Sequence, residues 1–350
     1  MKTINELKQC YYTELVPELT ELESLRKKLS KKILFTAFVG LSLLIIPPLA
    51  LSIISDTDIL KHEAEDKIGV IYFFFVFLFS AFLYPRDLQQ IYTKTFKDKI
   101  IEEIITFIDP YLTYDKEKHI PESDYAESLL FPIAPEKWDR FEGDDYVEGT
   151  VGKTNIRMSE LHYKKRKSAG SSTTYSTIFK GLFFIADLDR QFSGHTIVLS
   201  GSATKAFGFF NMLTGTLGEQ LKTGDPEFDK IFSVYGNNKR ESNYILSETQ
   251  RNRIVDFKRK TGKKIYISFT RSNVYVAVPY EKDLFEPKIF STVLDFSLIK
   301  EYFEDIQLAI SIVEGLDLSE LGQKVPPLLD LEQINRYRRQ CNKLGTTKKS

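Results

Sequence analysis

One hexapeptide, GTVGKT at 149–154, ends like a phosphate-binding loop. That motif needs a further glycine five residues before Gly152, where the chain has Val147. The hexapeptide also joins two expected strands, whereas a phosphate-binding loop opens a helix whose amino end faces the phosphates. We therefore interpret it as a hairpin turn.

Acid/base and metal chemistry have little support in the sequence. The four histidines are not at ligand spacing and the two cysteines lie near opposite ends of the chain, so we expect neither a metal nor a cofactor. Asp144 with Asp145, and Asp187 with Asp189, fall at expected strand ends and turns, where solvated aspartates are ordinary. We therefore expect no catalytic residues; the alternative is an enzyme whose site is assembled only in the fold.

Four consecutive basic residues form a candidate lipid-binding segment: Lys164, Lys165, Arg166 and Lys167. They precede the stretch SAGSSTTYS, which we expect to be a flexible linker between two strands. Near an anionic membrane, each basic residue close to the surface contributes about 1 kcal/mol of attraction. The alternative is a solvated hairpin tip.

A second candidate surface lies within 204–221, where helical spacing puts five apolar residues on one face: Phe207, Phe210, Leu213, Leu217 and Leu221. The first four are the candidate interface residues. Glycines weaken this expected helix by about 1 kcal/mol each relative to alanine. The face packs on the body of the protein, or it meets the membrane interface or a second protein.

The elements that would position these segments begin with two apolar runs. The run at 33–54 has 22 residues without a charge, and the run at 68–84 has 17. A helix needs about 20 such residues to cross the hydrocarbon core of a bilayer. The pattern predicts a two-span transmembrane hairpin, 33–84; the alternative is a buried helical hairpin.

The flanking charges predict the orientation of this hairpin. Basic residues precede the first run and follow the second, whereas the loop between them is mainly acidic. Because basic flanks stay on the cytoplasmic side, we expect both termini in the cytoplasm. Over the whole chain 48 basic residues balance 48 acidic ones, which argues against nucleic acid as a partner.

Two amphipathic helices are expected beside the hairpin, at 1–32 and 85–110, because leucines and isoleucines recur there at three- and four-residue intervals. Packed against each other they would form an antiparallel stalk. The alternative is that each packs separately on the body. A proline-rich connector follows at 111–135.

The segment 136–315 changes to strand periodicity, and a tail with a short basic helix follows at 316–350. We expect seven strands, at 144–151, 155–166, 177–188, 195–200, 243–247, 263–269 and 273–280. Expected helices occupy 226–235, 247–260 and 292–314. Short connections favour antiparallel pairing, so the predicted fold class is α+β: a mostly antiparallel sheet or half-barrel covered by helices, joined to the transmembrane hairpin and its helical extensions.

The stretch TGDPEFDKIFSVYGNNKRESNYILS, followed by KKIYISFTRSNVYVAV, resembles a bacterial family of unknown function, DUF3137. The preceding GTVGKTNIRMSELHY and FKGLFFIADL also resemble it, so the similarity spans about 131–287. The matching motif residues are Asp225, Pro226, Glu227, Phe228, Phe232, Tyr235, Tyr244 and Leu246. The sequence departs from the family at 239–243, KRESN, where a partner contact would differ.

The resemblance implies a bacterial inner (plasma) membrane protein with the same layout of two spans and a cytoplasmic body. It also implies a LemA-like membrane protein as partner. It implies no activity. From the residues and the resemblance together, we expect a membrane-anchored cytoplasmic binding or scaffold module that engages a membrane protein or anionic lipid, with homo-oligomerisation left open.

Overall fold

The computed structural model describes residues 2–54, 72–76, 79, 83–131, 139–169, 172–188, 190–201 and 217–315. The chain forms two compact units. The first comprises Met1–Lys118, Asp144–Val147 and Lys282–Leu308, and the second comprises His119–Gly143, Glu148–Glu281 and Ala309–Ser350. The α+β class predicted from the sequence is confirmed.

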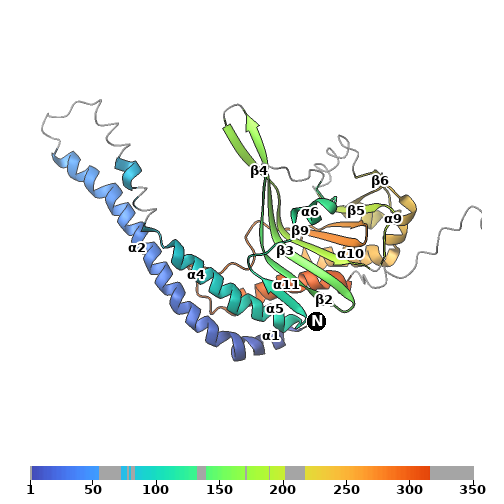
Figure 1. The fold of residues 1–350 in the computed structure, drawn as a ribbon, viewed down its shortest axis with the longest axis horizontal. Helices are drawn as coiled ribbons and strands as arrows, with labels where there is room; N and C mark the ends of the chain where they lie inside the picture. Colours follow the sequence, from blue (N-terminus) through green and yellow to red (C-terminus); the bar gives the residue numbers. More distant parts are fainter. Residues whose placement is uncertain are drawn as a thin grey trace, which may run out of the picture. The chain divides into compact units, whose positions relative to one another are not determined.

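The strands form one antiparallel sheet of nine strands, in the order β1-β2-β3-β4-β9-β8-β5-β7-β6 (Figure 1). This linear order leaves β1 and β6 as edges, so the sheet is open and does not close toward a barrel. The strands are β1 Leu112–Asp115, β2 Arg140–Val151, β3 Thr154–Ala169, β4 Ser172–Asp187, β5 His195–Ser200, β6 Glu219–Leu221, β7 Phe232–Gly236, β8 Tyr266–Thr270 and β9 Asn273–Pro279.

The longest pairing joins β3 to β4, from Ile156 opposite Ala186 out to Ala169 opposite Ser172. Strand β9 pairs with β4 only from Gly181 onward, so the outer half of the hairpin extends past it as a two-stranded ribbon (Figure 1). Gly181 marks the point where the backbones come together: its φ is +144°, and a Cβ there would lie 2.3 Å from the Val278 carbonyl oxygen.

The helices of the first unit are α1 Ile4–Cys10, η1 Tyr11–Leu15, α2 Val16–Ile54, α4 Arg86–Phe96, η2 Lys97–Ile101, α5 Glu102–Ile108 and, up to Leu308, α11 Phe296–Gly315. A capping box between Thr3 and Glu6 starts α1. The two η elements are single π-helical turns. The first precedes Pro17, whose missing N–H and bulky ring break regular α-helical bonding.

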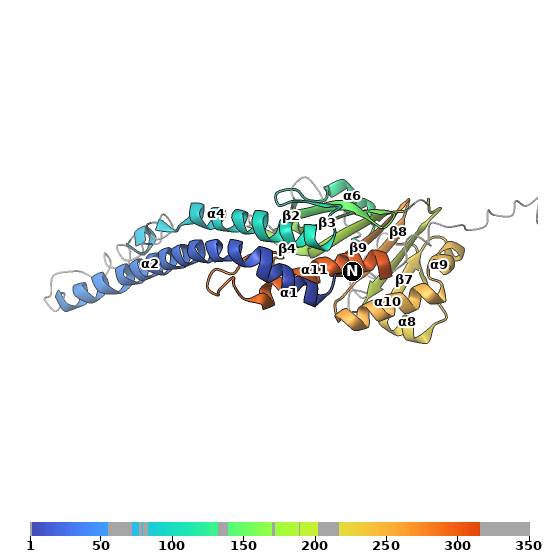
Figure 2. The ribbon, with the colours of Figure 1, turned by 90° about the horizontal axis from the view of Figure 1, so that it is seen from below.

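Helices α2 and α4 run side by side (Figure 2). Their apolar stripes are buried, for example at Leu19, Leu22, Tyr92 and Phe96. At the rim, the Lys99 ammonium lies 2.7 Å from carboxylates of both Glu18 and Glu21. Helices α2 and α4 therefore contact each other within the first unit.

A late segment of the chain, 282–295, completes the packing of the first unit. Tyr92 donates its hydroxyl to the Lys288 carbonyl at 3.0 Å, and Arg26 donates to the Ile289 carbonyl at 2.7 Å. Glu23 pairs with Arg26 at 2.8 Å and accepts the Val293 N–H at 3.2 Å. The Arg26 hydrogen bond lowers the pKa of Glu23 to about 2.

Helix α2 includes the first apolar run, whereas residues 55–71 and parts of the second run lie outside the described residues. Within the described part of the chain, no helix combines the length and the apolar character that a membrane crossing requires.

Helices of the second unit are α6 Glu122–Glu127, α8 Pro226–Ile231, α9 Lys239–Ile245 and α10 Glu248–Thr261. The expected helix at 247–260 is confirmed, since Ser247 caps α10 and Gly262, at φ +65°, ends it. Two expectations are wrong. The expected helix 226–235 ends at Ile231, where β7 begins, and the expected strand 243–247 lies largely in α9. Strands β1, β6 and β7 were not anticipated.

Aromatic side chains fill the core of the second unit around Tyr125, which is 1% exposed. Its ring stacks on Phe131, with centroids 4.9 Å apart and an angle of 7° between the planes. Tyr163 and Phe183 approach from strands β3 and β4. Among the described residues, the Tyr125 hydroxyl has no hydrogen-bond partner. A buried hydroxyl without a partner lowers stability.

We expect Tyr125→Phe to raise the free energy of unfolding by about 1 kcal/mol, because it removes this desolvated hydroxyl and keeps the ring. Urea unfolding of the detergent-solubilised full chain measures the change. Tyr163→Phe is the matched control: its hydroxyl donates to Asp139 at 2.9 Å, so its loss should be destabilising. A destabilised Tyr125→Phe would contradict the prediction.

Candidate functional site

Lys97 is a buried lysine in the first unit. It begins the π-helical turn η2, and its side chain is 4% exposed. The ammonium lies 2.7 Å from Asp144, 2.9 Å from Asp145 and 2.8 Å from Glu286. Tyr114, from strand β1, donates its hydroxyl to Asp145. We call these five residues the Lys97 cluster.

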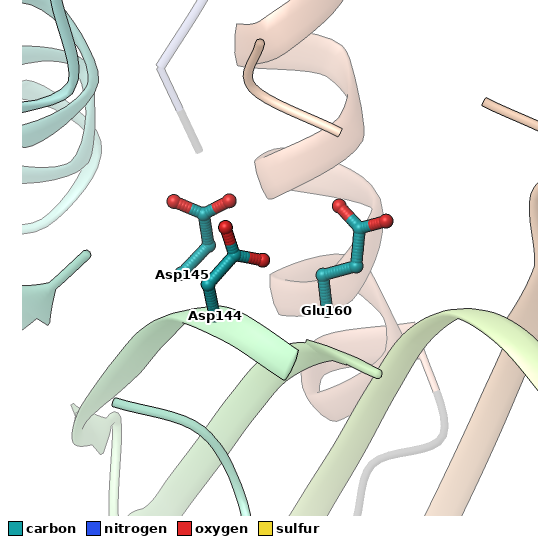
Figure 3. A group of neighbouring side chains, drawn as sticks. All are labelled: Asp144, Asp145 and Glu160. Atoms are coloured by element: carbon teal, nitrogen blue, oxygen red, sulfur yellow. The ribbon is translucent and has the colours of Figure 1, made fainter. Parts of the chain in front are cut away.

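Strand β2 supplies two consecutive carboxylates to the same lysine. Successive side chains of a regular strand point to opposite faces. Asp145 breaks that alternation with a left-handed φ of +58°, and the Asp144 and Asp145 carboxyl groups point to the same side (Figure 3). Glu160, labelled in the same view, comes from strand β3. A positive φ is uncommon for an aspartate. Here it occurs where the carboxylates of both Asp144 and Asp145 contact the Lys97 ammonium.

Burial dominates the electrostatics of the Lys97 cluster. The Asp145 side chain has 0% exposure, and burial raises its pKa to about 7, although Lys97 opposes the shift. Burial alone would lower the pKa of Lys97, but Asp145, Glu286 and Asp144 outweigh it, so that pKa is raised. Lys97 therefore stays protonated at neutral pH, and Asp145 exchanges its proton there.

The geometry limits what the Lys97 cluster can do. A protonated lysine is neither a base nor a nucleophile, and a carboxyl group without exposed surface does not meet a substrate. The cluster binds four separate chain segments together: η2, β1, β2 and the stretch containing Glu286. It is a structural junction whose charge changes near neutral pH.

The sequence prediction for Asp145 was wrong, because this residue is buried and ion-paired, whereas Asp144 keeps 39% side-chain exposure. Lys97, Tyr114 and Glu286 were missed altogether. One signal was available: Lys97 precedes Ile100 and Ile101 by three and four residues, which puts it on the apolar stripe of its helix. Tyr114 and Glu286 carry no comparable signal.

The candidate lipid-binding segment lies in strand β3, not before a flexible linker. Residues 164–169 pair with 172–177 of β4 on either side of the tip. Lys164 lies 3.0 Å from Glu142, and Lys165 lies 3.2 Å from Asp139. The Arg166 N–H donates to Asp139 at 2.8 Å, and Lys167 is exposed. Neighbouring carboxylates thus balance at least the charges of Lys164 and Lys165.

Three of the four candidate interface residues, Phe207, Phe210 and Leu213, lie outside the described residues. Leu217 is described and is 0% exposed, immediately before strand β6. It therefore belongs to the core of the second unit. Asp189 is also outside the described residues, so the pair that it was expected to form with Asp187 is not described either.

The motif residues carried over from the family resemblance have structural roles. Asp225 caps α8 by accepting the N–H groups of Glu227 and Phe228, each at 3.1 Å, and it pairs with Arg251 at 3.2 Å. Pro226 occupies the first turn of α8, where its missing N–H costs nothing. Four further motif side chains are buried: Phe228, Phe232, Tyr235 and Leu246.

The segment 239–243 holds a neighbouring turn in place. Glu241 accepts the Ser193 N–H at 3.0 Å and the Gly194 N–H at 2.9 Å. Its side chain is 9% exposed and lies 3.8 Å from Arg190, whose guanidinium stacks on Tyr244 at 4.7 Å. The acidic residue in this segment therefore stabilises the second unit.

Comparisons with known proteins confirm the family resemblance: residues 177–318 match the family described as "Protein of unknown function (DUF3137)". No curated protein matches the chain. The crystal structure of the mycobacterial trehalose monomycolate transport factor A, TtfA, is 10% identical, with 61% of this chain and 90% of that chain covered and a TM-score of 0.29. A similarity this weak establishes neither a shared fold nor a shared function.

Proposed function

We propose that this protein is a membrane-anchored, non-catalytic binding or scaffold module of the bacterial inner membrane, with both termini and its α+β body in the cytoplasm. In this proposal the runs 33–54 and 68–84 are the two spans. The helices α2 and α4 continue them and connect the membrane to the body.

The observation that carries the proposal is the exposure of large apolar side chains. On α2 beyond Lys32, Phe35 is 64% exposed, Phe38 68% and Leu41 57%. In the second run, Phe74 is 58% exposed and Phe75 64%. Such a concentration of exposed aromatic and aliphatic side chains is unfavourable in water and favourable in lipid.

The charges around the runs support the orientation. Lys27, Lys28, Lys31 and Lys32 stand at the start of the first run, and Arg86 and Lys94 follow the second. Lysine and arginine anchor the cytoplasmic ends of spans. The acidic loop between the runs is then the part outside the cell.

The proposed binding partners are anionic lipid and a membrane protein. The ion pairs of Lys164 and Lys165 reduce the net charge of the hairpin ribbon, so its attraction to anionic lipid is weaker than that of four unpaired basic residues. The LemA-like partner is what the family resemblance implies, and self-association is left open. Affinity capture of the detergent-solubilised full chain, with its lipids and proteins identified, names the partner.

We expect the full chain to remain with membranes after alkaline carbonate extraction and to be released by detergent. In a variant with both native cysteines replaced by serine, His62→Cys should react with a membrane-impermeant maleimide in intact cells, because the loop faces outward. Thr346→Cys, the matched control, should react only after the cells are permeabilised.

Release by carbonate would contradict membrane anchoring. Labelling of Thr346→Cys in intact cells would contradict the orientation while leaving the anchoring untouched.

A further inference from the structure

The first unit has a groove of about 510 Å³ between the α1–η1 helix and α5. Cys10 and Phe107 are its least exposed lining residues and form its floor. Glu6 and Glu14 on one wall and Glu103 on the other are exposed. The groove thus combines an apolar floor with an acidic rim.

The carboxylates of the rim affect the pKa of the Cys10 thiol at the floor of the groove. Within the described part of the chain, Glu14 and Glu103 have no ion-pair partner. Burial and, to a smaller extent, the negative charges of Glu103 and Glu14 raise the pKa of the Cys10 thiol to about 11. An occupant with positive charge and some apolar surface would be complementary to this groove.

Helix α11 passes next to the groove. Phe303 approaches Phe107, with ring centroids 6.2 Å apart, and Gln307 donates to the Lys2 carbonyl at 2.7 Å. The Lys2 ammonium in turn lies 5.0 Å from the centroid of the Phe107 ring. The chain after Gly315 therefore continues from a helix that already contacts one end of the groove.

The segment 333–350 has both the positive charge and the apolar surface that would complement this groove. Residues 333–350 contain six basic residues and no acidic one. Ile334, Tyr337 and Cys341 add less polar side chains at intervals of three and four residues. The segment 316–332 between α11 and this stretch spans up to about 3.5 Å per residue, so its length does not limit access.

We propose that the groove lined by Cys10, Phe107, Glu14 and Glu103 is the docking site of the chain's own basic carboxy-terminal segment, 333–350. The arginines pair with the acidic rim, and the apolar residues lie on the floor. Because the segment is tethered, its effective concentration at the groove is in the millimolar range, which allows weak ion pairs to hold it. This proposal is independent of the membrane anchoring proposed above.

Photocrosslinking of the full chain in intact cells tests the docking. Tyr337 is replaced by p-benzoylphenylalanine, and the crosslinked peptides are identified by mass spectrometry. We expect crosslinks to 2–15 and 102–108. In the double variant Glu14→Gln/Glu103→Gln their yield should fall roughly tenfold, because exposed ion pairs are individually weak but act together. Glu102→Gln, an exposed carboxylate of α5 outside the groove, should leave the yield unchanged.

Three outcomes would overturn the proposal. The first is crosslinking to other parts of the chain, and the second is a yield that the double variant does not lower. In mixtures of isotope-labelled and unlabelled copies, the crosslinks should join peptides of the same copy. Crosslinks between copies would assign the groove to a neighbouring chain and reject docking within one chain.

Discussion

Lys97→Met is expected to lower the free energy of unfolding by about 3 to 5 kcal/mol, because it leaves a buried carboxylate without its counter-charge. Asp145 has 0% side-chain exposure, and Lys97 is its cationic partner at 2.9 Å. Methionine fills much of the volume of the lysine stem, so the loss reports charge more than packing. Urea unfolding of the detergent-solubilised full chain, followed by circular dichroism at 222 nm, measures it.

Lys99→Met is the control for this prediction. Lys99 lies two residues further on and also pairs with two carboxylates, Glu18 and Glu21, but it does so at the protein surface. Its loss should cost far less, since solvent already screens exposed pairs. A second control is the double variant Lys97→Met/Asp145→Asn, which removes the buried charge together with its partner and should recover part of the stability. Equal losses in Lys97→Met and Lys99→Met would contradict the prediction.

The second expected result is a loss of stability as the pH rises toward neutrality, caused by Asp145. Its pKa is about 7 in the folded protein and 3.8 in the reference state. Between these values the folded state holds a proton that the unfolded state has released, so stability falls as the pH increases. The contribution is fully present below the lower value and is lost as the pH passes through the higher one. Its size is on the order of 4 kcal/mol.

Asp145→Asn isolates this contribution, because asparagine does not titrate. Between pH 5 and 7 the unfolding free energy of the wild type should fall, relative to that of the variant, by up to about 1.4 kcal/mol per pH unit. Urea unfolding at four or five pH values measures the slope. Tyr114→Phe removes a hydrogen bond that lowers the pKa of Asp145, so the loss of unfolding free energy should occur at higher pH in this variant. A difference that is constant across this range would contradict the assignment.

The sequence predicted those elements whose ends are set by residues close to them in the chain. Ser247 and Gly262 bracket α10 as its caps, and the short turn at 271–272 joins β8 to β9 as expected. The helical periodicity on either side of the two apolar runs predicted helices there, and the structure has α2 and α4 in those stretches. These features depend on spacing and caps within a few residues, which the sequence displays directly.

The remaining features depend on contacts between distant residues. The stretch around Tyr244 has the composition of a strand, yet it forms α9, where Asn238 caps the helix and Ile245 is buried. Asp145 follows Asp144 in a polar stretch and is nevertheless buried by Lys97 and Tyr114, which lie 48 and 31 residues earlier. The groove at Cys10 also requires two helical stretches, at 4–15 and 102–108, that lie far apart in the sequence. Tertiary packing overrides local preference in each case.

The Lys97 cluster has a consequence for biosynthesis. Glu286 is made long after Lys97 and Tyr114, and the backbone carbonyls that satisfy Tyr92 and Arg26 lie at 288 and 289. At about 5 to 20 residues per second, a ribosome takes roughly 10 to 30 s to travel from the end of the early helices to this segment. During that interval the helices α1 to α5 have left the ribosome, but the segment 282–295 that packs against them has not yet been made. Release of a nascent chain before residue 286 would therefore leave the amino-terminal helices unfinished, however complete their own sequence is.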